Sequence, residues 1–245
     1  SLGENHEFSV SGQILQFNWV PFFDLDIVDE KGRIDSSVSL DFSIDGQLLP
    51  VAKLQRGKIE ISQINLKSKD YQFQNSEKIS IRGDNAHFTL DRSAIIGNLG
   101  NLSLNGNYQA DNNTFNIHFH GLSYLDKLLL LQEDSSLKGK TTFDGDISGN
   151  SDNTSLELSL SLPHTSYSNE EFDLQAEMLN TTLQLHISDL FSQQPHFDSG
   201  RLSVQNIQLQ SKETTLKNEQ NLIFTLQNDN GVLSDFLLKS EKYHI

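Results

Sequence analysis

The 245-residue chain contains no cysteine, only four prolines and one methionine, and no apolar run longer than the four leucines at 128–131. The absence of cysteine excludes disulfides and thiolate metal sites. The apolar run is far shorter than the roughly 20 residues that a membrane-spanning helix needs. The few prolines argue against a proline-rich linker, and the single methionine argues against a helical bundle. The chain begins Ser-Leu-Gly, without an initiator methionine or a signal peptide, so we expect a processed protein or a piece of a longer one.

Basic residues are also scarce, because 18 Lys and Arg stand against 33 Asp and Glu, for a net charge of −15. Phosphate backbones are bound by concentrated basic surfaces, so the charge balance argues against a nucleic-acid partner. It also argues against simple electrostatic docking on anionic lipid. The acidic excess is typical of a soluble, well-solvated surface.

Catalytic and metal-binding motifs are missing as well. No nucleophile elbow, phosphate loop or paired acid/base signature occurs, and residues 144–146 lack the remaining ligands of a calcium loop. His118 and His120 share one face of an expected strand, but no third ligand has a recognisable spacing, so we interpret them as exposed strand histidines. We therefore expect no enzymatic activity, no cofactor and no metal.

Strict alternation of apolar and polar residues is what the sequence does contain, and it predicts an all-β protein. The clearest stretch, 57–68, recurs at 200–211, 143 positions later. Both copies slip by one residue, at Ser62-Gln63 and at Gln205-Asn206. A β-bulge at each slip would keep the aliphatic residues on one face of the strand. A shared irregularity favours an internal duplication over chance similarity.

Further matches suggest a second offset of 145 positions. Asp84-Asn85 aligns with Asp229-Asn230, and Pro50 aligns with Pro195. We expect a first β cassette at 1–121, a short helical or linker segment at 122–136, and a second cassette at 137–245. Leucines at helical spacing predict a short amphipathic helix within 122–133, and residues 189–194 suggest one helical turn.

Many expected strands end in an apolar-polar-apolar-polar-Gly pattern, as at Gly12, Gly83 and Gly106. Glycine after an alternating run commonly marks a turn or bulge with positive φ. The pattern therefore predicts a meander of antiparallel strands.

These features resemble the periplasmic body of the translocation and assembly module (TamB) family and, more loosely, its AsmA-like relatives. The resemblance rests on the glycine-bounded strands ending at Gly46 and Gly106, on Pro50, and on the stretches that begin at Gly57 and Gly139. It covers most of the chain, although the family's N-terminal membrane anchor and its greater length are not found here. The resemblance implies an elongated antiparallel β-taco, or half-pipe, with an apolar concave groove, located in the periplasm.

The same resemblance implies that phospholipid acyl chains lie in the groove, that an outer-membrane protein of the Omp85 family is a partner, and that the segment carries lipid between membranes or helps outer-membrane assembly. End-to-end self-association through unpaired edge strands is a further expectation. The candidate lining residues are the inward aliphatics of the strongest alternations: Phe42, Ile44, Ile59, Ile61, Ile64, Leu66, Leu102, Leu104, Leu156, Leu158, Leu160, Leu162, Leu183, Leu185, Ile187, Leu202, Val204, Ile207 and Leu209. Two alternatives fit the same alternation, a closed-core structural or adhesive β-repeat protein and a chaperone-like groove for outer-membrane strands.

Overall fold

The protein is described by a computed structural model. It covers residues 7–18, 35–47, 53–67, 71–127, 136–168, 173–190, 196–205, 207–210, 214–227, 230–234 and 237–242. The chain forms two compact units, residues 1–117 and 118–245, and the division falls within strand β8 (Thr114–Tyr124). The described part is all-β, as the alternation predicts, with no α-helix. No described helix is long and apolar enough to cross a membrane.

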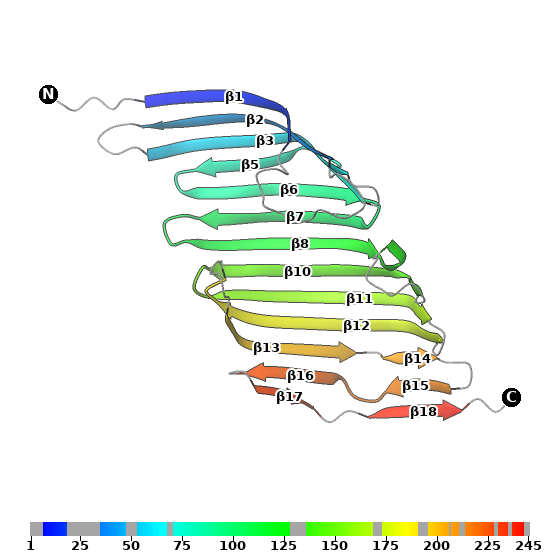
Figure 1. Cartoon of the computed structure of the whole chain (residues 1–245). Helices are drawn as coiled ribbons and strands as arrows, with labels where there is room; N and C mark the ends of the chain where they lie inside the picture. Colours follow the sequence, from blue (N-terminus) through cyan, green and yellow to red (C-terminus); the bar gives the residue numbers. More distant parts are fainter. Residues whose placement is uncertain are drawn as a thin grey trace. The chain divides into compact units, whose positions relative to one another are not determined.

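Unit 1 is an antiparallel sheet (Figure 1). Its strands are β1 (Glu7–Phe17), β2 (Asp35–Gln47), β3 (Lys53–Lys67), β4 (Gln72–Asn75), β5 (Ile79–Asp84), β6 (His87–Gly97), β7 (Gly100–Gln109) and the beginning of β8. The short strands β4 and β5 follow one another between β3 and β6, and each pairs with both of these neighbours. Asn85 and Ala86 link β5 to β6 with φ of 45° and 73°, the left-handed backbone that a two-residue hairpin turn requires.

Unit 2 is also antiparallel in its described pairings. Its strands are the rest of β8, then β9 (Ser136–Lys138), β10 (Lys140–Asn150), β11 (Thr154–Ser168), β12 (Asp173–Ser188), β13 (His196–Gln205), β14 (Gln208–Gln210), β15 (Thr214–Asn218), β16 (Leu222–Gln227), β17 (Asn230–Leu233) and β18 (Leu238–Lys242). The long strands β11 and β12 pair along most of their length. Figure 1 shows β13, β16 and β17 adjacent to one another, and β14, β15 and β18 forming a second group.

For the strands β3–β6 the internal repeat is confirmed by strand register. Every cross-strand partner pair of β3 with β4 or β5, and of β4 or β5 with β6, recurs 143 positions later in unit 2. Ile59 faces Ile81, for example, and Leu202 faces Phe224. The repeat is therefore a duplication of hydrogen-bonding geometry as well as of sequence.

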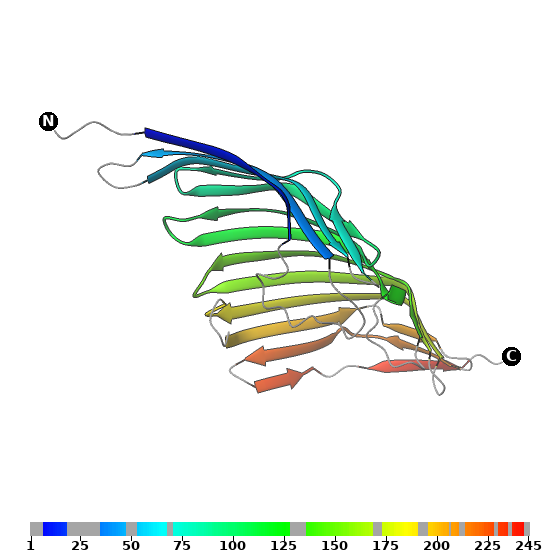
Figure 2. The ribbon, with the colours of Figure 1, turned by 45° about the horizontal axis from the view of Figure 1, so that its top comes forward.

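The first predicted bulge is confirmed. Ser39 faces Gln63 while the next residue, Leu40, faces Ile61, so Ser62 is the extra residue, and its hydroxyl donates to the carbonyl oxygen of Ser39 at 3.1 Å. In Figure 2 the paired strands β2 and β3, medium blue to cyan, bend along their length, which fits the extra twist that a bulge introduces. The second predicted bulge includes Asn206, which lies outside the described residues.

The offset of 145 at the hairpin is wrong. Asp84 faces His87 across the β5–β6 turn, and Gln227 faces Asn230 across the β16–β17 turn, so the two hairpins correspond at 143 positions. Asn85 lies in the β5–β6 turn, whereas Asn230 is the first residue of β17, so the two asparagines do not correspond. Pro50 and Pro195 both lie outside the described residues.

The predicted amphipathic helix within 122–133 is wrong where the segment is described. Residues 122–124 continue strand β8, and Leu125–Lys127 forms only a 3₁₀ turn. Ladder pairing of β8 with β10 therefore prevails over the helical spacing of the leucines. The rest of the segment lies outside the described residues, as does most of the turn expected at 189–194.

The interpretation of the strand-ending glycines as turn or bulge positions is wrong for several of them. Gly12, Gly83 and Gly106 lie inside β1, β5 and β7 and have no positive φ. At two of these positions a ring on the neighbouring strand occupies the place of the missing side chain: a Cβ on Gly12 would lie 2.7 Å from the Phe42 ring, and one on Gly83 would lie 2.8 Å from the Phe88 ring. Gly12 and Gly83 are therefore sites where an aromatic ring covers the backbone.

Candidate functional site

One face of the unit 1 sheet is built from cross-strand rows of apolar side chains. Residues that face each other across antiparallel strands lie on the same side of the sheet, so the strand registers define the rows. One row runs through Gly12, Phe42, Ile59, Ile81, Leu90 and Gly106, and the next runs through Ile14, Leu40, Ile61 and Ile79. The alternation in the sequence thus becomes a continuous apolar face.

The structure brings the predicted lining residues of unit 1 onto this face. Phe42 and Ile44 lie on β2, and the bulge at Ser62 keeps Ile64 and Leu66 on the side of Ile59 and Ile61. Leu66 faces Phe73 on β4. On β7, Leu104 faces Ser93 and Leu102 faces Ile95.

Unit 2 has an equivalent apolar face. Leu156 and Leu158 on β11 face Leu185 and Leu183 on β12, and Leu162 faces Leu179. One partner across this row is polar, because Leu160 faces Thr181. On β13, Leu202 faces Leu183 and Val204 faces Thr181.

Three further predicted lining residues of unit 2 have different surroundings. Ile187 is buried and lies opposite Thr154 and Phe197. The side chain of Ile207 is half-buried, between β13 and β14. The backbone of Leu209 pairs with Ala176 and Leu216.

The apolar faces are largely unsealed in the described part of the chain. Only Ile79, Leu125 and Ile187 are buried hydrophobic residues there, at 6–8% exposure. Ile59, in the middle of a row, is 37% exposed, and Ile14 is 40% exposed. An ordinary two-layer β protein buries such rows against a second layer, whereas these side chains remain in reach of solvent or of an apolar ligand.

Two asparagines that sequence reasoning missed interrupt these faces at equivalent positions. The Oδ1 atom of Asn75 accepts a hydrogen bond from the backbone nitrogen of Ile64 at 2.7 Å, while its Nδ2 donates to the carbonyl oxygens of Glu77 and Ser62 at 2.8 and 3.2 Å. Asn218, 143 positions later, repeats the contact with the backbone nitrogen of Ile207 at 2.9 Å. The side-chain amide replaces the ladder bond that is lost where the strand is broken. Extending the 143-residue alignment through these asparagines would have found them.

The histidine pair is more constrained than predicted. The Nδ1 atom of His118 lies 3.1 Å from Oδ1 of Asp146, and its Nε2 lies 3.6 Å from Oδ2 of Asp144, while the His118 and His120 ring centroids are 5.8 Å apart. The His118 side chain is about one-third exposed rather than fully so. Within the described ranges no group of three or more potential ligands is arranged to hold a metal ion.

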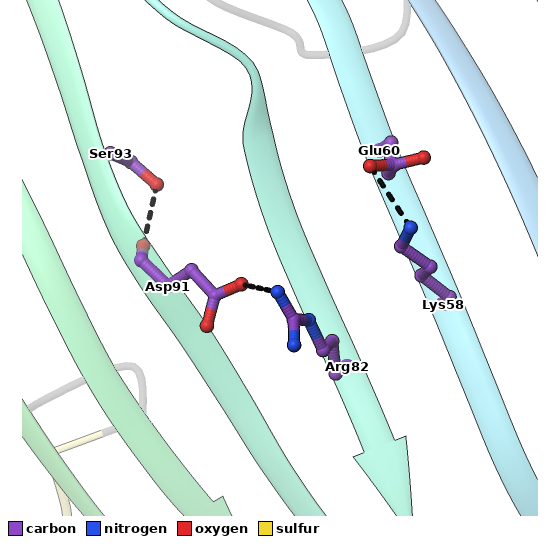
Figure 3. Close-up of polar contacts among 5 residues, drawn as sticks. All are labelled: Lys58, Glu60, Arg82, Asp91 and Ser93. Carbon is purple, nitrogen blue, oxygen red and sulfur yellow. Dashed lines mark hydrogen bonds and ion pairs between the residues drawn. The ribbon is translucent and has the colours of Figure 1, made fainter.

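The opposite face of unit 1 is polar and carries paired charges, shown in Figure 3. The Nζ atom of Lys58 lies 3.0 Å from a carboxylate oxygen of Glu60, and Nη2 of Arg82 lies 2.7 Å from a carboxylate oxygen of Asp91. The hydrogen bond from Lys58 is the main cause that holds the pKa of Glu60 below its usual value. Each sheet face therefore has its own chemistry, apolar on one side and charged on the other.

No protein-family model, curated protein or solved structure matches the chain.

Proposed function

We propose that the chain is a periplasmic segment whose apolar sheet faces carry the acyl chains of phospholipids between the inner and outer membranes. The observation that carries this proposal is the row of half-exposed aliphatic residues on each apolar face, with hardly any buried core in the described residues. Acyl chains are the apolar ligand whose length and flexibility suit continuous rows of this kind. The resemblance to the TamB family adds the location and the intermembrane role.

In this proposal the sheet curls into a half-pipe, and the apolar face becomes its groove. The polar face stays in water, and the chain's net charge of −15 helps to keep so much apolar surface soluble. An outer-membrane protein of the Omp85 family is the proposed partner at the receiving membrane, where the segment would deliver lipid or assist assembly. Edge strands such as β1, which pairs only with β2 in the described residues, are the proposed sites of self-association.

The proposal is tested by asking whether lipid lies on one face and not on the other. A photo-crosslinking residue at Leu158, on the apolar face, should capture phospholipid during expression. The same residue at the neighbouring Ser159, on the opposite face, should not. Native mass spectrometry and organic extraction of the purified protein identify the captured species.

The alternatives predict other outcomes of this experiment. A closed-core structural protein yields no lipid at either position. A chaperone-like groove yields crosslinks at Leu158 to polypeptide rather than to lipid, and either result contradicts the lipid-carrying proposal.

A further inference from the structure

We propose that a phosphate-type oxyanion binds a cleft on the polar face of unit 1. The cleft has a volume of about 370 Å³ and lies over β2, β3, β5 and β6. Three cationic side chains line it, those of Arg56, Lys58 and Arg82, together with His87 and the hydroxyls of Ser43 and Thr89. In a chain with net charge −15, this convergence of cations is a local exception.

Two of the cations are direct cross-strand neighbours although their like charges repel each other. Lys58 and Arg82 face each other directly across β3 and β5, a position where like charges destabilise a sheet. Each side chain is drawn to a carboxylate outside the cleft lining, Lys58 to Glu60 and Arg82 to Asp91, as Figure 3 shows. An anion bound between them would attract both cations.

The third cation, Arg56, makes no ion pair among the described residues. Arg56 lies two residues before Lys58 on the same face of β3, opposite Asp45 on β2 and Asp84 on β5. Within the part of the chain that the structure describes, its guanidinium nevertheless makes no ion pair with either carboxylate. An unpaired guanidinium offers the planar pair of donors that oxyanions accept best.

The internal repeat indicates that the fold does not require these cations. The same registers recur in unit 2, where Ser199 replaces Arg56, Thr225 replaces Arg82, and only Lys58 has a basic counterpart, Arg201. The ladder forms equally well without the cluster. Arg56 and Arg82 are therefore additions of unit 1 to the repeat scaffold, which fits a binding site better than a structural need.

The residues that line the cleft determine which class of ligand it can bind. Two guanidiniums, an ammonium and two hydroxyls present donors from several directions, which suits a compact tetrahedral oxyanion. His87 is held in place because its Nδ1 lies 2.9 Å from Oε1 of Gln109. Asp45 and Asp84 also line the cleft and oppose an anion, so we expect binding in about the millimolar range. The site lies on the face opposite the apolar rows and does not depend on lipid transport.

The test is a calorimetric titration of the purified protein with inorganic phosphate at low ionic strength. Wild-type protein should bind phosphate saturably, and Arg56→Gln or Arg82→Gln should weaken binding about fivefold or more. Arg201→Gln, at the position in unit 2 that corresponds to Lys58, is the matched control and should leave binding unchanged. Asp84→Asn removes a repelling carboxylate and should strengthen binding about two- to threefold.

Two further arms distinguish the source of the oxyanion. Glycerol 3-phosphate reports on soluble phosphate esters, and co-sedimentation with phosphatidylglycerol vesicles, against phosphatidylcholine vesicles, reports on a lipid headgroup. If Arg56→Gln abolishes binding of glycerol 3-phosphate or of phosphatidylglycerol vesicles, the result supports the site. The ligand that is lost then identifies the source of the oxyanion. Absence of saturable phosphate binding, or an equal loss in Arg201→Gln and Arg56→Gln, overturns the proposed site. Either outcome leaves crosslinking at Leu158 unaffected, so the two proposals fail separately.

Discussion

Asn75 accepts a hydrogen bond from the backbone nitrogen of Ile64 at 2.7 Å, and this contact occupies the point where the strand between β3 and β6 is broken. The corresponding residues of the repeat, Asn218 and Ile207, make the same contact at 2.9 Å. Both copies have a polar side chain inside an apolar face at this point. Its amide oxygen is the hydrogen-bond acceptor for the backbone N–H group of Ile64 in one copy and of Ile207 in the other. The asparagine is thus a structural part of the repeat.

We expect Asn75→Leu to destabilise the protein by about 1–3 kcal/mol, because the N–H group of Ile64 would lose its acceptor in a partly buried place. Urea denaturation followed by circular dichroism measures the loss. Asn107→Ala, an exposed asparagine on β7, is the control and should change stability by less than about 0.5 kcal/mol. Equal stability of Asn75→Leu and wild type would show that water replaces the side chain.

An apolar face that is open should tolerate a charge. We expect Leu158→Asp and Ile61→Asp to remain folded, because both side chains are only half-buried and a carboxylate there can reach water. The same variants should lose most co-purified lipid. In a sealed core either charge would be unpaired, would destabilise the protein by several kcal/mol and would unfold it. Melting curves and lipid extraction on the same samples separate the two cases.

A double-mutant cycle tests whether the Phe88 ring excludes a side chain at Gly83. Gly83→Ala should destabilise unit 1 by about 1–3 kcal/mol, because the new Cβ would lie 2.8 Å from a carbon of the Phe88 ring. Phe88→Leu removes the ring, and in that background Gly83→Ala should be clearly less destabilising. A coupling of at least about 0.5 kcal/mol is expected between residues in contact. Strict additivity would mean that the backbone, and not the ring, excludes a side chain at this position.

The Lys58–Glu60 pair gives a prediction about pH. The pKa of Glu60 is lowered, chiefly by the hydrogen bond from Lys58, so its carboxylate favours folding above the ordinary pKa of a glutamate. This contribution should disappear as the pH falls through the lowered folded-state pKa. NMR titration of Glu60 should show its pKa rising toward the ordinary value in Lys58→Gln. The effect on stability should be small, because the pair is exposed to solvent.

The strand content and the repeat could be predicted because both are local patterns. Alternation with period two marks a strand wherever one face is apolar, and the slip at Ser62 marks a bulge because only an extra residue restores the face. The same reasoning located the aliphatic residues that share a face on β3 and β11. These signals lie within one strand and need no knowledge of its neighbours.

Features that depend on register could not be predicted. The ring of Phe88 covers Gly83 only because β5 and β6 are joined by a two-residue turn that places these residues opposite each other. His118 lies beside Asp146 across strands β8 and β10, 28 positions apart in the sequence. Leu122 has helical spacing with its neighbours yet lies in strand β8. Hydrogen bonding to an adjacent strand favours the extended backbone more strongly than the leucine spacing favours a helix.

The broken strand has a consequence for the cooperativity of unit 2. Strands β13, β16 and β17 hydrogen-bond in one group, whereas β14, β15 and β18 form another, with the break beside Asn218 between them (Figure 1). Few ladder bonds cross such a break, so each group is a candidate for opening as a separate unit. Amide hydrogen exchange should therefore resolve two protection classes in these strands. The loss of the Asn218 side chain should lower protection in β14, β15 and β18 before it affects β13 and β16.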